Sequence, residues 1–243
     1  MKFLSCNIEG NRHFVRILPL LEREKADVVA LQEVFECDLE ELRQATGLAQ
    51  VAFYPQADIT LPNDHLPLRG PWGVAIFANE IVEEKHHYYF GHENGKLAVF
   101  DNDHPSLIDR VALAVKARVA GQDFQVLTVH FTWSGEGAVN VAQRRDYLEL
   151  SSFMKQFDEM IFCGDLNTPR AYEIWDDLAK KYTDNIPAEI NTTIDKNLHK
   201  SGKDIRLVID ALFTSPHYLL EEVRVLPDTS DHMAVVALVK RTS

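Results

Sequence analysis

The chain has 243 residues, of which 46% are hydrophobic and 26% charged, and its formal net charge is −12. This length and composition are typical of one globular domain, which we expect to span residues 1–243. No apolar run approaches the eighteen or so residues that cross a bilayer, so we expect no membrane insertion. The excess of acid argues against strong nonspecific binding to duplex nucleic acid, because phosphate contacts need Lys and Arg.

The three cysteines, Cys6, Cys37 and Cys163, do not have the spacing of a metal site. Cys6 and Cys163 lie in apolar runs, where cysteine packs as a small hydrophobic residue. We therefore expect reduced thiols and a cytoplasmic protein. No apolar export segment precedes Cys6, so we expect the mature chain to begin at Met1.

In the first third of the chain, hydrophobic periodicity predicts two strands and two helices. The strands are expected at residues 2–7 and 27–34, and the helices at about 12–25 and 38–45. Four prolines then predict a long loop over residues 55–71 that borders a site.

The middle of the chain is rich in strands with no helix between them. We expect these strands at residues 73–78, 82–90, 96–100, 110–120 and 124–130. The helix predicted next, at 139–157, has apolar residues spaced for one face, though imperfectly.

The last third of the chain begins with the apolar run Met160-Ile161-Phe162-Cys163, which predicts a strand ending at Gly164-Asp165. A helix is expected from about residue 170 to 180, and residues 185–204 are polar and irregular. Three further strands are predicted, at residues 205–214 (interrupted by Asp210), 218–226 and 233–239.

Strands outnumber helices, and no glycine-rich phosphate loop is present. Both features favour two packed sheets over a doubly wound nucleotide-binding fold.

Polar residues end or interrupt many of the predicted strands: Asn7, Glu33, His130, Asp165, Asn167, Asp210, Asp231 and His232. Strand ends gather at one rim of a sheet, so these side chains can converge. Oxygen ligands with few histidines suit Mg²⁺ or Mn²⁺ better than zinc. The alternative is ordinary structure, in which Asp165 or Asn167 caps a helix and Glu33 is a surface acid.

The order of these residues resembles the endonuclease/exonuclease/phosphatase (deoxyribonuclease-I-like) superfamily, from Asn7 to Val239. The matching segments are Asn7, Gln32-Glu33, His130, Gly164-Asp165-Leu166-Asn167, Asp210 and Ser230-Asp231-His232. The resemblance implies an α/β fold, a four-layer α/β/β/α sandwich of two mostly antiparallel or mixed sheets flanked by helices. It also implies one catalytic domain over residues 1–243, with its site at one rim of the sheets.

The resemblance implies a divalent-metal site. Glu33 corresponds to the principal ligand of Mg²⁺ or Mn²⁺, with Asn7 beside it and Asp231 contributing. The metal would polarise the phosphoryl group and stabilise the leaving oxygen.

The resemblance also implies catalytic roles. Asp165 would orient or deprotonate the attacking water, and Asn167 would hold the nucleophile or a phosphate oxygen. His232, oriented by Asp210, and His130 would donate to phosphate oxygens as negative charge builds.

Three residues outside the motifs have more than one possible role. Arg110, at a strand start, either clamps phosphate or is an ordinary surface residue. His199, in a long loop, could reach the rim, and Trp133 follows His130. The remaining histidines, His13 among them, are expected at the surface or in loops.

The substrate is expected to be a phosphodiester or phosphomonoester: a short nucleic-acid end, a nucleotide or a phosphorylated small molecule. The text Val-Ile-Asp-Ala-Leu around Asp210 lacks the aromatic-aspartate-arginine signature of inositol-polyphosphate phosphatases. The competing hypothesis is a non-catalytic binding member of the same fold, which uses the rim for a partner.

Overall fold

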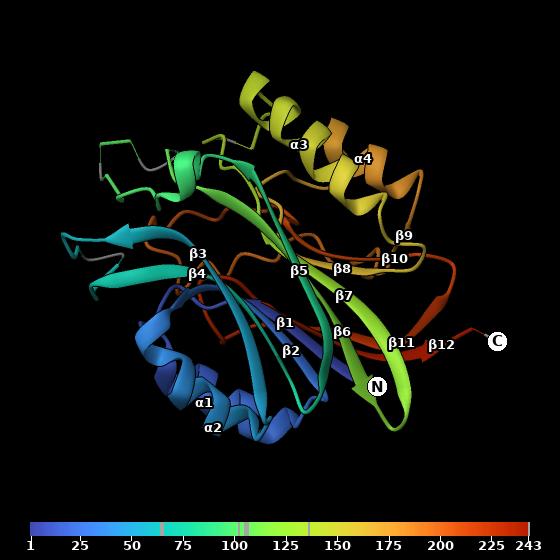
Figure 1. Cartoon of the computed structure of the whole chain (residues 1–243). Helices are drawn as coiled ribbons and strands as arrows, with labels where there is room; N and C mark the ends of the chain where they lie inside the picture. The colour runs from blue at the N-terminus through green and yellow to red at the C-terminus, as the bar shows by residue number, and fades with distance from the viewer. Residues whose placement is uncertain (64–65, 102, 105–106, 136, 243) are drawn as a thin grey trace.

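The computed structural model describes residues 1–63, 66–101, 103–104, 107–135 and 137–242. Within these ranges the strands form two sheets of six, packed face to face, and helices cover the outer side of each sheet (Figure 1). The predicted α/β/β/α sandwich with two mixed sheets is therefore confirmed.

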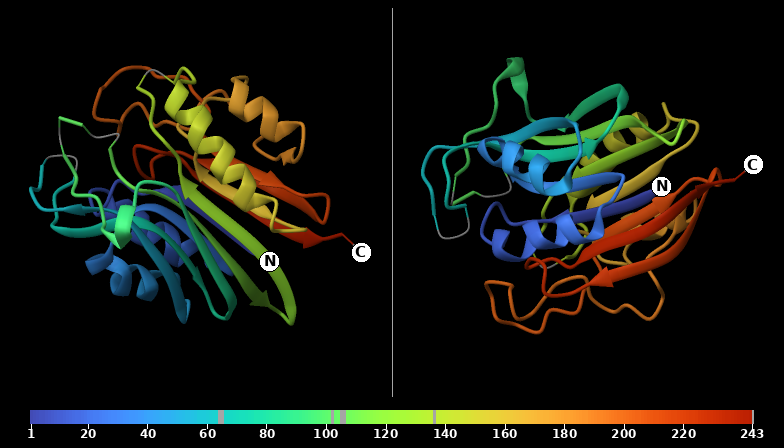
Figure 2. Two further views of the ribbon diagram at one scale, coloured as in Figure 1. Left: turned by 45° about the horizontal axis from the view of Figure 1, so that its top comes forward. Right: turned by 90° about the horizontal axis from the view of Figure 1, so that it is seen from below.

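The first sheet has the strand order β11-β12-β1-β2-β4-β3. Its strands are β1 (Lys2–Asn7), β2 (Val28–Phe35), β3 (Gln50–Ile59), β4 (Gly70–Ala78), β11 (Tyr218–Leu226) and β12 (Ala234–Arg241). Only β1 and β2 pair in parallel among these described strands. Figure 2 shows β1, in blue, beside the red β12, so the two ends of the chain meet in one sheet.

The second sheet has the strand order β5-β6-β7-β8-β10-β9. Its strands are β5 (Ile81–Phe90), β6 (Arg110–Val119), β7 (Gln122–His130), β8 (Ile161–Asp165), β9 (Thr183–Asp184) and β10 (Asp210–Thr214). Here β7 and β8 are the parallel pair among the described strands.

The central strands are apolar throughout because both of their faces are buried. In β1, Phe3 packs into the core between the sheets, whereas Leu4 and Cys6 pack on the opposite face beneath the helices. Val28 and Val29 of β2 divide between the same two cores. This division follows from the two-residue period of a strand.

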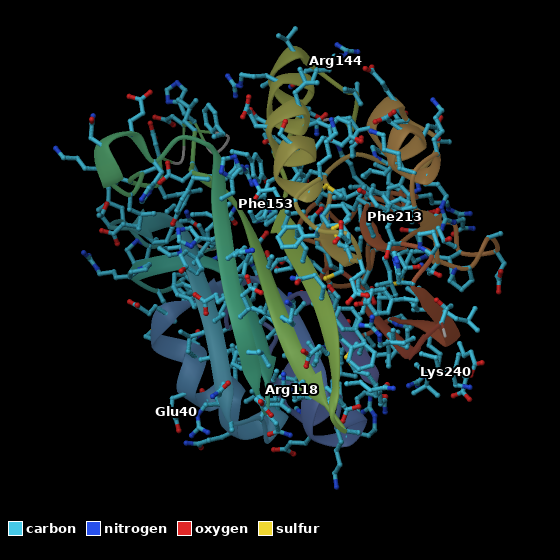
Figure 3. The ribbon with its side chains drawn as sticks, turned by 45° about the vertical axis from the view of Figure 1, so that its right-hand side comes forward. Glu40, Arg118, Arg144, Phe153, Phe213 and Lys240 are labelled. Carbon is cyan, nitrogen blue, oxygen red and sulfur yellow. The ribbon has the colours of Figure 1, made fainter. Side chains whose placement is uncertain are left out.

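The helices lie in two pairs on opposite outer faces (Figure 1). Helices α1 (Phe14–Glu24) and α2 (Leu39–Thr46) cover the first sheet, and α3 (Val141–Met154) and α4 (Glu173–Ala179) cover the second. Phe153 of α3 stacks on His87 of β5, with ring centroids 5.4 Å apart. Arg144 lies near the other end of α3 (Figure 3). It pairs with Glu173 of α4 at 2.7 Å.

Three predicted elements differ from the structure: the strand at 96–100, the loop over 55–71 and the strand at 205–214. One helix also starts later than expected. Residues 96–100 form no strand, and Val99 makes only an isolated bridge with Asp58. The loop expected over 55–71 is shorter, because β3 continues to Ile59 and accommodates Pro55 at a register shift. Of this expected loop, residues 64 and 65 lie outside the described ranges.

The predicted strand 205–214 begins only at Asp210, so that residue starts β10 instead of interrupting a strand. The helix expected from about residue 170 begins at Glu173. The remaining predicted strands and helices agree with the structure to within a few residues at each end.

Candidate active site

The predicted polar residues lie at one rim of the two sheets. Asn7, His130 and Asp165 are the last residues of β1, β7 and β8, and Asp210 is the first residue of β10. In the second sheet, Asp165 stands opposite His130 on one side and Asp210 on the other. Strand pairing therefore places these three side chains next to one another.

Asn7 connects the two sheets at this rim. Its side-chain amide donates to Glu33 Oε1 at 2.9 Å and to Asp165 Oδ2 at 3.2 Å, and its Oδ1 accepts from the backbone N–H of Glu9 at 3.2 Å. Asn7 is fully buried. In this arrangement Asn7 orients the two carboxylates through its amide group.

Glu33 reaches the rim through an irregularity of β2. The register with β4 shifts between Gln32 and Val34, and Glu33 has φ 61°. A bulge redirects a side chain, and the left-handed backbone is strained for a residue with a Cβ. As a result Glu33 Oε1 lies 3.7 Å from His130 Nε2.

Both oxygens of the Asp165 carboxylate are held, and Oδ2, which accepts from the Asn7 amide, also faces two histidines. The backbone N–H of Asn167, a residue with φ 47°, donates to Asp165 Oδ1 at 2.8 Å. Asp165 Oδ2 lies 3.7 Å from His130 Nε2 and 3.8 Å from His232 Nε2. The Asn167 amide also donates to the Phe131 carbonyl at 3.1 Å, which fixes that side chain.

Asp210 orients His232. The Nδ1 atom of His232 lies 2.9 Å from Asp210 Oδ2 and 3.0 Å from Oδ1, so the ring presents Nε2 to Asp165. The chain before β10 is held by Thr193, whose hydroxyl accepts from the backbone N–H groups of Ile209 and Asp210, each at 3.1 Å. An Asp–His pair of this kind stabilises a protonated imidazole.

Burial and mutual charge shift the titration of this pair. Burial raises the pKa of Asp165 to about 7, against the lowering effect of His232. Burial alone would lower the pKa of His232, but the Asp210 and Asp165 carboxylates raise it well above its ordinary value. A carboxylate that accepts a proton near neutral pH and a cationic imidazole are thus adjacent.

Asp231 belongs to a neighbouring group that the sequence did not predict. Its carboxylate lies with Glu9 and His13 in a cluster whose ligand atoms are all within 4.8 Å of one another. His13 lies in the turn before α1, as expected of a loop residue, but it is buried there, with Nε2 2.8 Å from Glu9 Oε2. Neither Glu9 nor His13 ends a strand, and the only sequence signal was an acid two residues after Asn7.

The donor groups at the rim fit a divalent cation. Asp165, Asp210 and His232 form a second cluster with ligand atoms within 4.8 Å, and Glu33 lies beside it through Asn7. Buried carboxylates with one or two histidines suit Mg²⁺ or Mn²⁺.

Arg110 is almost completely buried, so the interpretation as a surface residue is wrong. Its guanidinium donates to the carbonyls of Phe131 at 2.9 Å and His130 at 3.1 Å, which anchors the end of β7. A cavity of about 380 Å³ opens in front of the rim. His199 lines this cavity as anticipated, together with the site residues Glu33, His130, Asp165, Asn167, Asp231 and His232.

The fold and the rim define a class of two-sheet α/β/β/α proteins with acids and histidines at one sheet edge. A family model described as the endonuclease/exonuclease/phosphatase family matches residues 4–232, and the chain belongs to this family. Curated protein sequences gave no significant match. Among the described residues, no helix is long and apolar enough to cross a bilayer.

Solved structures agree on the fold. An endonuclease/exonuclease/phosphatase from Bacteroides vulgatus has a TM-score of 0.73 at 17% identity, covering 99% of this chain and 98% of its own. A mannosyl-6-phosphatase from Bacteroides thetaiotaomicron has a TM-score of 0.72 at 16% identity and 99% coverage of both chains. The human Nocturnin catalytic domain, with a bound sulfate, has a TM-score of 0.64 at 19% identity, covering 100% of this chain and 93% of its own.

Proposed function

We propose that the protein is a divalent-metal-dependent hydrolase of phosphoester bonds. The observation that supports this most is the convergence of His130 and His232 on one oxygen of Asp165, with Nε2–Oδ2 distances of 3.7 and 3.8 Å. A phosphate oxygen or a water between these atoms would meet a proton acceptor and two proton donors at once.

The attacking water would lose its proton to Asp165, whose other oxygen is occupied by the Asn167 N–H. His232 would donate from Nε2 to a phosphate oxygen while Asp210 holds Nδ1. His130 would donate to a second phosphate oxygen, and the Asn167 amide would help to hold the nucleophile or the phosphate.

Glu33 would be the principal ligand of Mg²⁺ or Mn²⁺, with Asn7 beside it and Asp231 contributing. When bound, the ion polarises the phosphoryl group. The free thiols Cys6, Cys37 and Cys163 support a protein that works in a reducing compartment, which we propose to be the cytoplasm.

The substrate we propose is a phosphomonoester or phosphodiester small enough to enter the cavity, such as a phosphorylated small molecule, a nucleotide or a short nucleic-acid end. The net charge of −12 argues against tight, sequence-independent binding of long duplexes. The names of two structural neighbours, a mannosyl-6-phosphatase and Nocturnin, are compatible with a phosphoester substrate.

A substrate panel with Mg²⁺, Mn²⁺ or EDTA tests the proposal. The panel contains p-nitrophenyl phosphate and its diester, nucleotides, tailed oligonucleotides and sugar and lipid phosphates. We expect release of product only with a divalent ion and its loss in Asp165→Asn. A protein that hydrolyses none of these and does not respond to metal would favour the alternative, a non-catalytic binding member of the fold.

A further inference from the structure

Beyond the catalytic rim, the cavity is walled mainly by apolar side chains. On one side lie Trp72, at the start of β4, and Ile108 and Phe100, from the segment between β5 and β6. Trp72 is 3% exposed and packs edge-on against the His130 ring, with centroids 5.5 Å apart. Trp72 and Ile108 belong to a small core at this end of the molecule, which makes the wall rigid.

The opposite wall comes from the chain that leads into β10. Ile205, Leu207 and Ile209 line the cavity from this segment, joined by Ile194. Three hydrogen bonds hold it: Thr193 N–H to the Leu207 carbonyl at 2.9 Å, Met233 N–H to the Thr193 carbonyl at 2.7 Å, and Thr192 Oγ1–H to the Ile205 carbonyl at 3.1 Å. The wall is therefore built into the fold and is present without a ligand.

Trp133 stands at the cavity as a third apolar element, with 46% of its surface exposed. Among the described lining residues outside the catalytic rim and the anchored Arg110, His199 and Lys200 carry polar side chains, and Trp72 and Trp133 each add a single indole N–H. Lys200 is exposed, so we place it at the mouth of the cavity and not in its interior. A leaving group inside would thus meet mainly carbon atoms on both sides.

We propose, resting on the function above, that this cavity is a leaving-group subsite for one compact, planar, apolar group, such as a single aromatic ring attached through the ester oxygen. A volume of about 380 Å³ lies near the lower end of ligand pockets and cannot enclose a chain of nucleotides. A hexose in the same place would press its hydroxyls against isoleucine and leucine and lose their hydrogen bonds to water.

Two primary alkyl esters with similar intrinsic reactivity separate these cases. Benzyl phosphate and a hexose 6-phosphate are assayed with Mn²⁺, each as the monoester and as its methyl diester. We expect kcat/KM to be at least about tenfold higher for the benzyl ester, because each hexose hydroxyl buried without a hydrogen-bond partner costs its desolvation free energy, equivalent to about a tenfold change or more. Equal values, or a preference for the hexose ester, would overturn the subsite.

A binding measurement keeps the subsite separate from the chemistry. Calorimetry on the Mn²⁺-loaded protein compares benzylphosphonate with methylphosphonate, which share the anionic group and differ in the ring. We expect benzylphosphonate to bind at least about tenfold more tightly, a ratio that falls towards one in Leu207→Asn and in Trp133→Ala. The control is Leu219→Ala, which removes an exposed leucine on β11 and should leave the ratio unchanged.

The outcomes are distinct. A tighter benzylphosphonate complex without hydrolysis of any ester retains the subsite and rejects the proposed hydrolase. Metal-dependent hydrolysis with no gain from the ring, or a gain that survives both cavity variants, retains the hydrolase and rejects the subsite. Thermal melts of each variant identify any loss of folding.

Discussion

At the scale of single residues, Asp165 has the most demanding position. Its two oxygens contact Asn7, Asn167 and the two histidines, and burial raises its pKa to about 7. We expect Asp165→Asn to lower kcat by on the order of a hundredfold or more while the protein stays folded. Asp123→Asn, which changes a carboxylate paired with Arg118 far from the rim, is the matched control. Wild-type turnover in purified Asp165→Asn would remove this residue from the mechanism.

Gly164, just before that aspartate, is required by the packing of β8 on β7. A Cβ at Gly164 would lie 2.1 Å from the Val129 carbonyl oxygen, and its φ of +123° is unfavourable for any side chain. We expect Gly164→Ala to lower the free energy of unfolding by roughly 2–4 kcal/mol, measured by urea denaturation.

Gly121→Ala separates the two causes of that loss. Gly121 also has a positive φ, of +77°, but no atom lies within 4 Å of its Cβ position. Its substitution should cost only about 1 kcal/mol, the strain of the backbone alone. Equal losses in the two variants would mean that the contact with Val129 has no effect.

The sequence indicated the candidate catalytic residues because each one ends or interrupts an apolar run. Asn7, His130 and Asp165 are the last residues of their strands, and their order along the chain resembles the order of motifs in the family. Glu9 and His13 do not end an apolar run, because they lie in the turn after β1. Only the folded chain brings them close to Asp231. Trp72 was likewise missed, since its contact with His130 joins strands of different sheets.

At the scale of elements, apolar runs in the sequence predicted most strands, but they did not predict what each run packs against. Residues 205–209 are as apolar as a strand, yet their side chains at Ile205, Leu207 and Ile209 line the cavity, and β10 begins only at Asp210. An apolar run that lines a site and an apolar run in a sheet can have the same composition. The four-layer arrangement came from the family resemblance, because periodicity alone cannot assign strands to two sheets.

Helix α1 is joined to the first sheet by two ion pairs of Glu24, which we expect to make stability depend on pH. Glu24, its last residue, is 7% exposed and meets Lys2 of β1 at 3.0 Å and Arg224 of β11 at 2.7 Å. Burial alone would raise its pKa, but hydrogen bonds from Arg224 and Lys2 lower it to about 2. The unfolded chain therefore binds this proton more readily than the folded one.

The stabilising contribution of Glu24 is present above its unfolded pKa near 4.5 and is lost as the pH falls towards 2. In Glu24→Gln we expect a loss of about 1–3 kcal/mol at pH 7, because charged hydrogen bonds are removed, and a shallower fall of stability between pH 4.5 and 2. Urea titrations at a series of pH values measure both. Identical slopes for the variant and the wild type would contradict the assignment.

At the scale of the whole molecule, buried carboxylate side chains are concentrated at the rim where the two sheets meet. The chain carries a net charge of −12, and Glu9, Glu33, Asp165, Asp210 and Asp231 are all buried at one rim. Buried carboxylates at such a density repel one another unless protons or cations compensate them. His13, His130 and His232, with Arg12 and Arg110, supply compensating groups, and a bound cation would add to them, so folding and cation binding should be linked.

A cation that binds only the folded protein stabilises it by about 2.7 kcal/mol at a hundred times its Kd. We therefore expect saturating Mn²⁺ or Mg²⁺ to raise Tm by several degrees, and Glu33→Gln to shift the midpoint of this effect to higher metal concentration. Glu40→Gln, on the exposed face of α2 (Figure 3), should respond as the wild type does. An unchanged Tm with metal would mean that protonation alone compensates the charge of the buried carboxylates at the rim. An unchanged midpoint in Glu33→Gln would mean that the ion binds at the Glu9–His13–Asp231 or the Asp165–Asp210–His232 cluster instead.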